Sequence, residues 1–138
     1  MGKEGRVRRQ LEQVEAFHRE FGCHLEEGPT ANLDEETTDV RARLIDEELA
    51  EYRQAVSSGD VVQVADALSD LMYVLLGTYL AHGLQRHAEA LFDEVHRSNM
   101  SKLDENGRPV LREDGKILKP SSWSPPQLGE VLTQPPQE

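Results

Sequence analysis

Two long segments with helical apolar periodicity, about 33–57 and 60–82, are separated only by the short break "SSGD". Helices joined by so short a connection pack as antiparallel neighbours. Two further amphipathic segments, about 4–21 and 85–100, flank this pair and carry apolar residues at three- and four-residue spacing. The pattern therefore predicts an all-α fold, a four- to five-helix bundle.

The expected helix ends have local signals. Gly22 and Gly83 stand where helices one and three should stop. Asn32, followed three residues later by Glu35, resembles the capping box that begins a helix.

After position 100 the periodicity ends. Turn signals at Asn106-Gly107 and Asp114-Gly115 predict a short hairpin in which "PVL" and "KIL" pair around "REDG". Ser124, followed by two prolines, is the expected N-cap of a short last helix. We expect a single domain over 1–138, with a helical core at about 4–100 and a hairpin with an irregular tail at about 101–138.

The composition of the chain argues against several classes of function. The formal net charge is −11, which argues against phosphate-driven binding of DNA or RNA. A lone cysteine, Cys23, excludes an internal disulfide framework and fits a reducing compartment. No secretory signal is recognisable, and the apolar stretch after Asp70 is about half a bilayer span. We expect a cytoplasmic protein with no membrane and no nucleic-acid partner.

The acidic cluster in "LIDEELAEY" does not lie on the expected solvent face. At about 100° per residue, Glu47, Glu48 and Glu51 fall on the same side of the helix as Leu44 and Val40. A solvated acidic face is the ordinary interpretation of such a cluster. The phase instead directs these glutamates into the bundle.

The next helix is apolar almost all round, which predicts a buried helix. Its exceptions share one face: Asp66, Asp70, Tyr73 and Gly77 fall within a narrow arc. Two buried carboxylates at i and i+4 repel each other and need a counter-charge, and few basic residues are near.

A divalent metal ion is the simplest counter-charge. Five carboxylates without His or Cys form an all-oxygen site, which favours Mg²⁺, with Mn²⁺ as the alternative. The expected metal ligands are Glu47, Glu48, Glu51, Asp66 and Asp70. A di-iron centre is the competing interpretation, but the histidines do not have Glu-x-x-His spacing relative to these acids.

Six further residues are candidate contacts to a substrate or its phosphates. A helix cap, a surface lysine or a packed histidine is the alternative interpretation for several of them. The candidates are Asn99, Lys102, Lys116, Lys119, Tyr73 and His18.

These segments resemble the all-α nucleoside triphosphate pyrophosphohydrolases of the MazG and dimeric dUTPase superfamily, especially small MazG-like members with dUTPase-type activity. The resemblance covers about 14–128 and includes "FHREFG", "DEELAEYRQA", "ADALSDLMYVLLGT", "FDEVHRSNMSK" and "DGKILKPSSWSPP". It implies Mg²⁺-dependent hydrolysis of a nucleoside triphosphate, with dUTP the first candidate, to the monophosphate and pyrophosphate. It also implies an obligate oligomer, a homodimer or a dimer of dimers.

Position by position, the resemblance matches Glu47, Glu48, Glu51 and Asp70 to metal ligands. It matches the segment of Asn99, Ser101 and Lys102 to a nucleotide- or phosphate-contacting motif. The family's second motif is usually Glu-x-x-Asp, but this chain has Ala67 where the glutamate would stand, and Asp66 is the substitute one residue earlier.

We expect an enzyme of nucleotide-pool sanitation. Glu48, Glu51 and Asp70 would hold the principal ion, Glu47 and Asp66 would complete a second site, and Glu47 together with Glu48 would be catalytic. The alternative is a non-catalytic helical oligomer that binds a nucleotide or a metal as a sensor or regulator.

Overall fold

The computed structural model describes residues 6–136 and is helical, with no named strand in that range. Its helices are α1 (Arg8–Phe21), α2 (Glu35–Ser58), α3 (Val61–Ala81), α4 (Ala88–Met100) and α5 (Leu128–Thr133). The predicted all-α class is confirmed. The chain forms two compact units, Met1–Gln85 and Arg86–Glu138.

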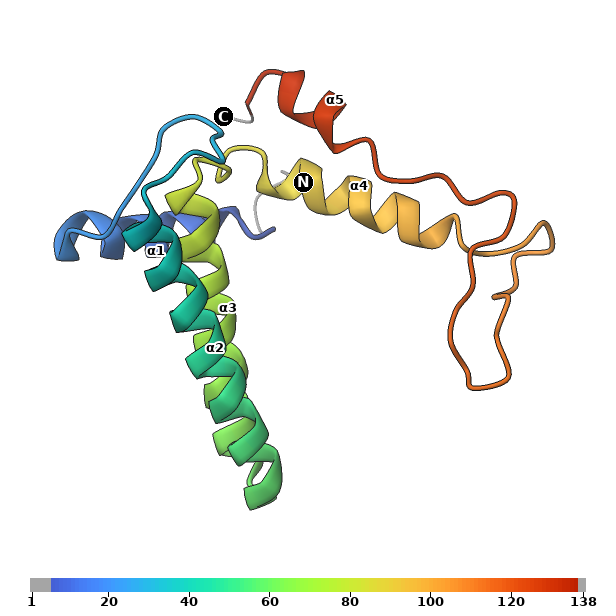
Figure 1. Cartoon of the computed structure of the whole chain (residues 1–138), viewed down its shortest axis with the longest axis horizontal. Helices are drawn as coiled ribbons and strands as arrows, with labels where there is room; N and C mark the ends of the chain where they lie inside the picture. The colour runs from blue at the N-terminus through green and yellow to red at the C-terminus, as the bar shows by residue number, and fades with distance from the viewer. Residues whose placement is uncertain (1–5, 137–138) are drawn as a thin grey trace. The chain divides into compact units, whose positions relative to one another are not determined.

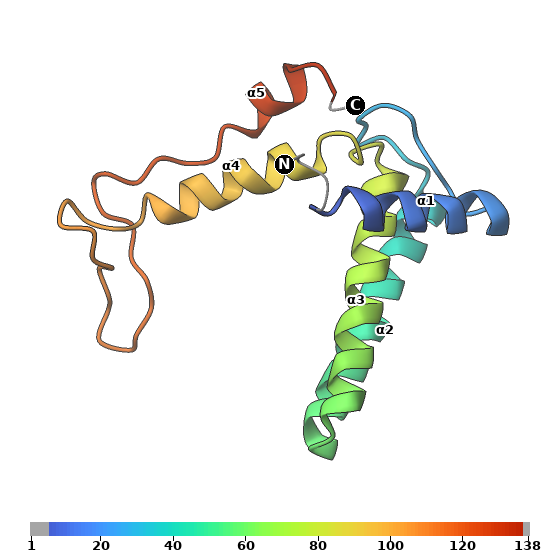
Figure 2. The same ribbon diagram turned by 180° about the vertical axis from the view of Figure 1, so that it is seen from behind.

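In the first unit, α2 and α3 lie side by side and antiparallel over most of their length (Figures 1 and 2). The connection between them is as short as the sequence predicts, because Gly59 adopts a left-handed φ of 70° that ends α2. The Asp60 carboxylate then accepts a hydrogen bond from the Val62 amide at 2.9 Å and begins α3. Helix α1 crosses the pair near the end where α2 begins and α3 ends (Figures 1 and 2).

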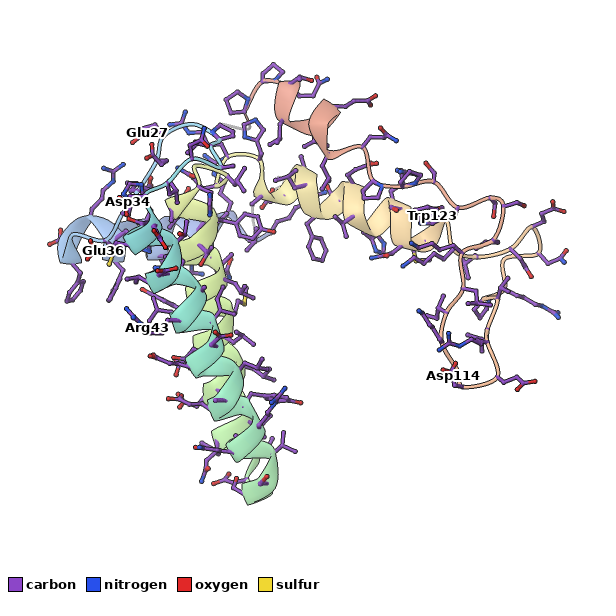
Figure 3. The ribbon with its side chains drawn as sticks, viewed as in Figure 1. Glu27, Asp34, Glu36, Arg43, Asp114 and Trp123 are labelled. Carbon is purple, nitrogen blue, oxygen red and sulfur yellow. The ribbon has the colours of Figure 1, made fainter. Side chains whose placement is uncertain are left out.

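Most predicted helix ends agree with the structure, but two N-caps differ. Asp34, not Asn32, caps α2, since its carboxylate accepts a hydrogen bond from the Thr37 amide at 2.7 Å (Figure 3). The last helix begins after Gln127 rather than after Ser124, because Ser124 is engaged with α4: its carbonyl accepts a hydrogen bond from Ser98 Oγ at 2.8 Å. Residues 4 and 5 of the first predicted helix lie outside the described residues.

The expectation that the third helix is buried all round is wrong for the single chain. One side of α3 packs on α1 and α2, where Ala67, Leu76 and Leu80 are buried. Other apolar side chains of α3 are exposed, among them Leu68, Met72 and Leu75. The physical reason is that two other helices, α1 and α2, are described in the first unit, and two helices are too few to surround a third.

Helix α3 is also long and apolar enough to cross a membrane by length and composition alone. Core helices of soluble proteins meet the same criteria, so this is weak evidence for a membrane span.

The second unit consists of α4, the predicted hairpin and α5. Isolated bridges join Leu111 to Ile117 and Leu103 to Pro109, and the tip of the hairpin turns at Asp114 (Figure 3). The Ser101 hydroxyl accepts a hydrogen bond from the Ser124 amide at 2.9 Å, so the returning chain is held against the end of α4.

Candidate metal centre

Three of the five predicted carboxylate ligands meet between α2 and α3. One carboxylate oxygen from each of Glu48, Glu51 and Asp70 lies within 4.8 Å of the other two. Glu48 and Glu51 stand one turn apart on α2, and Asp70 faces them from α3. The prediction that these glutamates point into the bundle agrees with the half-buried Glu48, but it is wrong for Glu47 and Glu51, which are exposed in the single chain.

Burial differs within this carboxylate cluster of Glu48, Glu51 and Asp70. Glu48 is half-buried, whereas Glu51 and Asp70 are exposed. Glu48 Oε2 is fully buried and has no hydrogen-bond partner among the described residues. A buried carboxylate oxygen without a donor is costly, and a bound cation would remove that cost.

The electrostatics of Glu48 are those of a crowded acidic site. Desolvation raises the pKa of its carboxyl above the ordinary value, and the neighbouring charges of Glu51, Asp70 and Glu47 raise the pKa further. The donor set fits Mg²⁺ or Mn²⁺, since it consists of carboxylate oxygens with no sulfur or imidazole.

The other two predicted ligands lie outside the carboxylate cluster. Glu47 is exposed on α2, near enough to influence Glu48 electrostatically. Asp66 is exposed on α3, one turn before Asp70.

Two candidate substrate contacts in the first unit, Tyr73 and His18, differ in their exposure. Tyr73 is 40% exposed and meets Phe17 of α1 edge to face, with ring centroids 5.6 Å apart. His18 is buried at 3% exposure and shares a hydrogen bond of 2.9 Å between Nδ1 and the carbonyl of His24. Burial, with a smaller contribution from Arg41, lowers the pKa of His18, which favours the neutral imidazole of a packed residue.

The remaining candidates belong to the second unit. Lys102 Nζ donates a hydrogen bond to Asn99 Oδ1 at 3.0 Å, so the two predicted phosphate contacts are paired with each other. Lys119 Nζ lies 4.4 Å from the ring centroid of Trp123, a cation–π contact. Lys116 is exposed beside the turn at Asp114.

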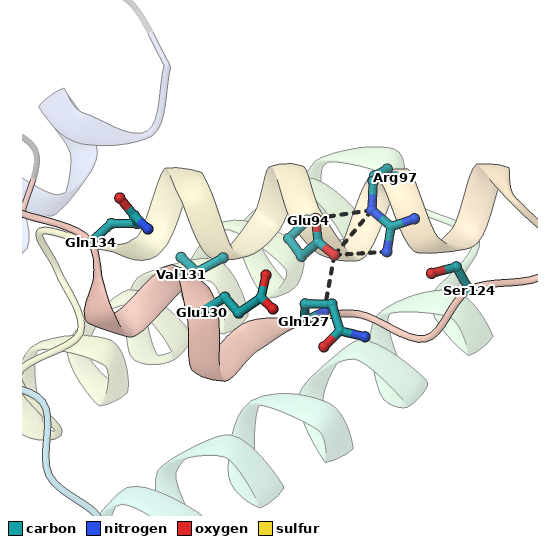
Figure 4. Close-up of a pocket in the computed structure, with 7 residues that line it drawn as sticks. All are labelled: Glu94, Arg97, Ser124, Gln127, Glu130, Val131 and Gln134. Atoms are coloured by element: carbon teal, nitrogen blue, oxygen red, sulfur yellow. Dashed lines mark hydrogen bonds and ion pairs between the residues drawn. The ribbon is translucent and has the colours of Figure 1, made fainter.

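A shallow pocket of about 370 Å³ also lies in the second unit, between α4 and α5 with the residues that flank α5 (Figure 4). The Glu94 carboxylate on its wall accepts hydrogen bonds from Arg97 Nη2 at 2.7 Å and from the Gln127 amide at 2.9 Å. The Arg97 hydrogen bond is the main reason why the pKa of Glu94 is lowered. This carboxylate is therefore occupied in fastening α5 to α4.

Two features of the first unit did not emerge from the sequence. Arg41 is buried between α2 and α3, and Phe17 stacks on Phe21 with centroids 4.3 Å apart while both rings remain exposed. For Arg41 a signal was present: it stands seven residues before Glu48 and therefore lies on the same helix face.

Comparison with known proteins assigns the family. A comparison with curated proteins found no match. The family model described as phosphoribosyl-ATP pyrophosphohydrolase matches residues 14–99, which is more than half of the chain and spans α2, α3 and the carboxylate cluster. This family lies within the MazG-like all-α superfamily, whose pyrophosphohydrolases typically use a divalent metal ion. The chain therefore belongs to the phosphoribosyl-ATP pyrophosphohydrolase family and is a nucleotide pyrophosphohydrolase.

Proposed function

We propose that this protein hydrolyses a deoxynucleoside triphosphate, with dUTP as the first candidate, to the monophosphate and pyrophosphate with the help of Mg²⁺. The single observation that carries the metal dependence is the carboxylate cluster, with its unpartnered buried oxygen on Glu48. The preference for dUTP rests on the resemblance to small MazG-like members with dUTPase-type activity. The family match supports the reaction class.

Glu48, Glu51 and Asp70 would hold the principal ion, and Glu47 and Asp66 would complete a second site. When bound, Mg²⁺ supplies charge that neutralises the triphosphate and makes a water molecule more acidic. Mn²⁺ would serve in its place, because it accepts the same oxygen ligands.

Glu47 is the proposed general base. Its exposed carboxylate stands next to Glu48 on α2 and can take a proton from water. The water oxygen attacks the α-phosphorus, and the bond from this phosphorus to the oxygen bridging the α- and β-phosphates breaks. Pyrophosphate leaves with that oxygen, and the proton of the water passes to Glu47.

Aromatic side chains would form the part of the site that binds the nucleobase. Tyr73 follows Asp70 on α3 by about one turn, and Phe17 and Phe21 continue from it as an exposed aromatic surface. We call these three residues the aromatic cluster. A nucleobase can stack on such side chains, with a typical contribution of about 1–3 kcal/mol per base.

Lysines of the second unit would contact the phosphates. Lys102 and Asn99, which are paired at the end of α4, are the proposed phosphate or nucleotide contacts, together with Lys116 and Lys119. Their ammonium groups would stabilise charge on the departing pyrophosphate.

We further propose that the protein acts as a cytoplasmic homodimer or dimer of dimers, with 1–138 as one functional domain. The exposed apolar side chains Leu68, Met72 and Leu75 follow one another on α3 at helical spacing. A contiguous apolar stripe of this kind is typical of an interaction surface. A second copy of the chain would cover it.

Phosphoribosyl-ATP is the second candidate substrate, because the matching family model is described by that activity. The test is a panel of the four common dNTPs, dUTP and phosphoribosyl-ATP, each incubated with and without Mg²⁺ and assayed for pyrophosphate. We expect release from dUTP that requires Mg²⁺. Pyrophosphate release from phosphoribosyl-ATP alone would show that phosphoribosyl-ATP, and not dUTP, is the substrate.

The same panel of nucleotides distinguishes an enzyme from a non-catalytic sensor. Tight nucleotide binding without any product would contradict hydrolysis and favour the non-catalytic binding protein.

A further inference from the structure

Arg41 connects α2 to α3 through a closed set of hydrogen bonds. Its Nε donates to Thr78 Oγ1 at 3.1 Å, and its Nη2 donates to the carbonyl of Val74 at 2.7 Å. The Thr78 hydroxyl in turn donates to the same Val74 carbonyl at 2.8 Å. The guanidinium is thus held at two points on α3, and only 8% of the residue is exposed.

The structure describes no acidic partner for this buried charge within residues 6–136. Among the residues that the structure describes, no carboxylate lies within ion-pair distance of Arg41. The guanidinium instead donates its hydrogen bonds to Thr78 and to the Val74 carbonyl, both in the C-terminal half of α3. Burying a charge in this way is costly unless its hydrogen bonds are well formed.

Gly77 provides the space for the guanidinium. A Cβ at this position would lie 2.5 Å from Arg41 Nη2 and 2.8 Å from His18 Nε2. Any larger residue would therefore displace the Arg41 head group or the buried histidine. The space beside Gly77 and the paired hydrogen bonds of Arg41 together define one position of α2 along α3.

The spacing between the Arg41 contact and the carboxylate cluster is similar along α2 and along α3. Glu48 follows Arg41 by seven residues, which is about 10.5 Å and nearly two full turns along α2. In the opposite direction along α3, Asp70 precedes Val74 and Thr78 by about 6 and 12 Å. Because the helices are antiparallel, the Arg41 contact brings Glu48 opposite Asp70.

We propose that Arg41 is a positioning residue that fixes the register of α2 against α3, so that Glu48 and Glu51 stand opposite Asp70 as divalent-cation ligands. The cation-binding part of this inference rests on the proposed metal site. Slippage by one helical turn would shift the helices by about 5.4 Å, more than the 4.8 Å within which the three carboxylates meet. Apolar packing alone resists such slippage poorly, whereas a single buried polar contact can specify a register.

The test measures binding of Mn²⁺ alone, without nucleotide, by electron paramagnetic resonance well below the melting temperature. The variants are Arg41→Met, Arg41→Lys and the matched pair Thr78→Val and Thr78→Ser. We expect Arg41→Met and Thr78→Val to weaken Mn²⁺ binding about 10-fold or more, the range for residues that orient metal ligands. Thr78→Ser, which keeps the hydroxyl, should retain the affinity.

Val14→Ala is the stability control. Val14 is a buried residue of α1, 2% exposed, and its truncation lowers the melting temperature without touching the α2–α3 contact. A merely structural role for Arg41 predicts unchanged Mn²⁺ affinity in every folded variant, and that result would overturn the proposal. If Arg41→Met does not fold, Arg41→Lys and the Thr78 pair decide the question, since lysine keeps the charge but not both hydrogen bonds.

A second readout does not depend on the metal. Spin labels at the exposed positions Arg43 and Gln63, in a Cys23→Ala background diluted with unlabelled protein, report the α2–α3 register as a distance. We expect one narrow distribution for the parent and a broadened or shifted one for Thr78→Val. Wild-type protein that binds no Mn²⁺ would contradict the proposed metal site, whereas an unchanged distance distribution would contradict the register proposal itself.

Discussion

Glu48 of α2 and Asp70 of α3 bring carboxylate oxygens within 4.8 Å of each other, although they lie on two different helices. Burial disfavours the charged form of Glu48, and the nearby charges of Glu51 and Asp70 add to this cost. The antiparallel helix pair therefore maintains an arrangement that is unfavourable without a cation.

Replacement of Glu48 tests the catalytic role of this arrangement. We expect Glu48→Gln to reduce Mg²⁺-dependent pyrophosphate release by about 100-fold or more, because even residues that only orient ligands are typically worth 10- to 100-fold. Circular dichroism should show the same helical content as the parent. The matched control is Asp46→Asn, an exposed acid in the same stretch outside the carboxylate cluster. Equal turnover in parent and Glu48→Gln would contradict the mechanism.

The raised pKa of Glu48 predicts how stability depends on pH in metal-free protein. Its folded pKa lies above the ordinary value of 4.5, so between the two values the native state binds more protons than the unfolded state. The free energy of unfolding must then fall as pH rises through that window. Melting curves in EDTA should show this loss for the parent and a smaller one for Glu48→Gln. Parallel pH profiles for the two proteins would exclude this destabilising interaction.

The two α3 aspartates should differ in their contribution to metal binding. Asp70 belongs to the carboxylate cluster, whereas Asp66 is exposed one turn away. We expect Asp70→Asn to weaken Mn²⁺ binding about 10-fold or more and Asp66→Asn to weaken it less. Isothermal titration without nucleotide measures both affinities. Equal losses would instead indicate that Asp66 binds the ion as the substitute for the glutamate that this chain lacks.

The fold and the cluster were predictable to different extents. Helix positions follow from apolar periodicity and from stop signals such as Gly22 and Gly83, which are local features. The convergence of Glu48, Glu51 and Asp70 follows from helix phase together with the short connection. Helix phase places Arg41 on the same face as Glu48, but it does not show that Arg41 is buried, because its hydrogen-bond partners are more than thirty residues away on another helix.

The exposed side of α3 illustrates another limit. Apolar character all round a helix indicates burial, but it does not say whether the same chain or another copy covers the surface. In the single chain that side is uncovered at Leu68, Met72 and Leu75.

A charge in the apolar stripe of Leu68, Met72 and Leu75 should dissociate the proposed dimer into monomers. Burial of one Met side chain typically contributes about 1.5–3 kcal/mol, and a two-fold interface counts each substitution twice. We expect Met72→Glu to shift the protein from dimer to monomer in light scattering coupled to size-exclusion chromatography. Gln63→Glu, with the same charge change on the opposite face of α3, should leave the dimer intact. Wild-type protein that elutes as a monomer, or a dimeric Met72→Glu variant, would contradict this interface.

Phe17 tests the proposed contact with the nucleobase. Its ring stacks on Phe21, meets Tyr73 edge to face and is 39% exposed. Loss of a base-stacking contact of about 1–3 kcal/mol corresponds to a KM increase of about 5- to 150-fold for Phe17→Ala, with kcat largely retained. Inorganic tripolyphosphate, which has no base, should bind the parent and Phe17→Ala equally well. Val61→Ala, at an exposed apolar position at the start of α3, is the matched surface control. If Phe17→Ala weakens tripolyphosphate and nucleotide binding alike, the aromatic cluster supports the helices rather than the base.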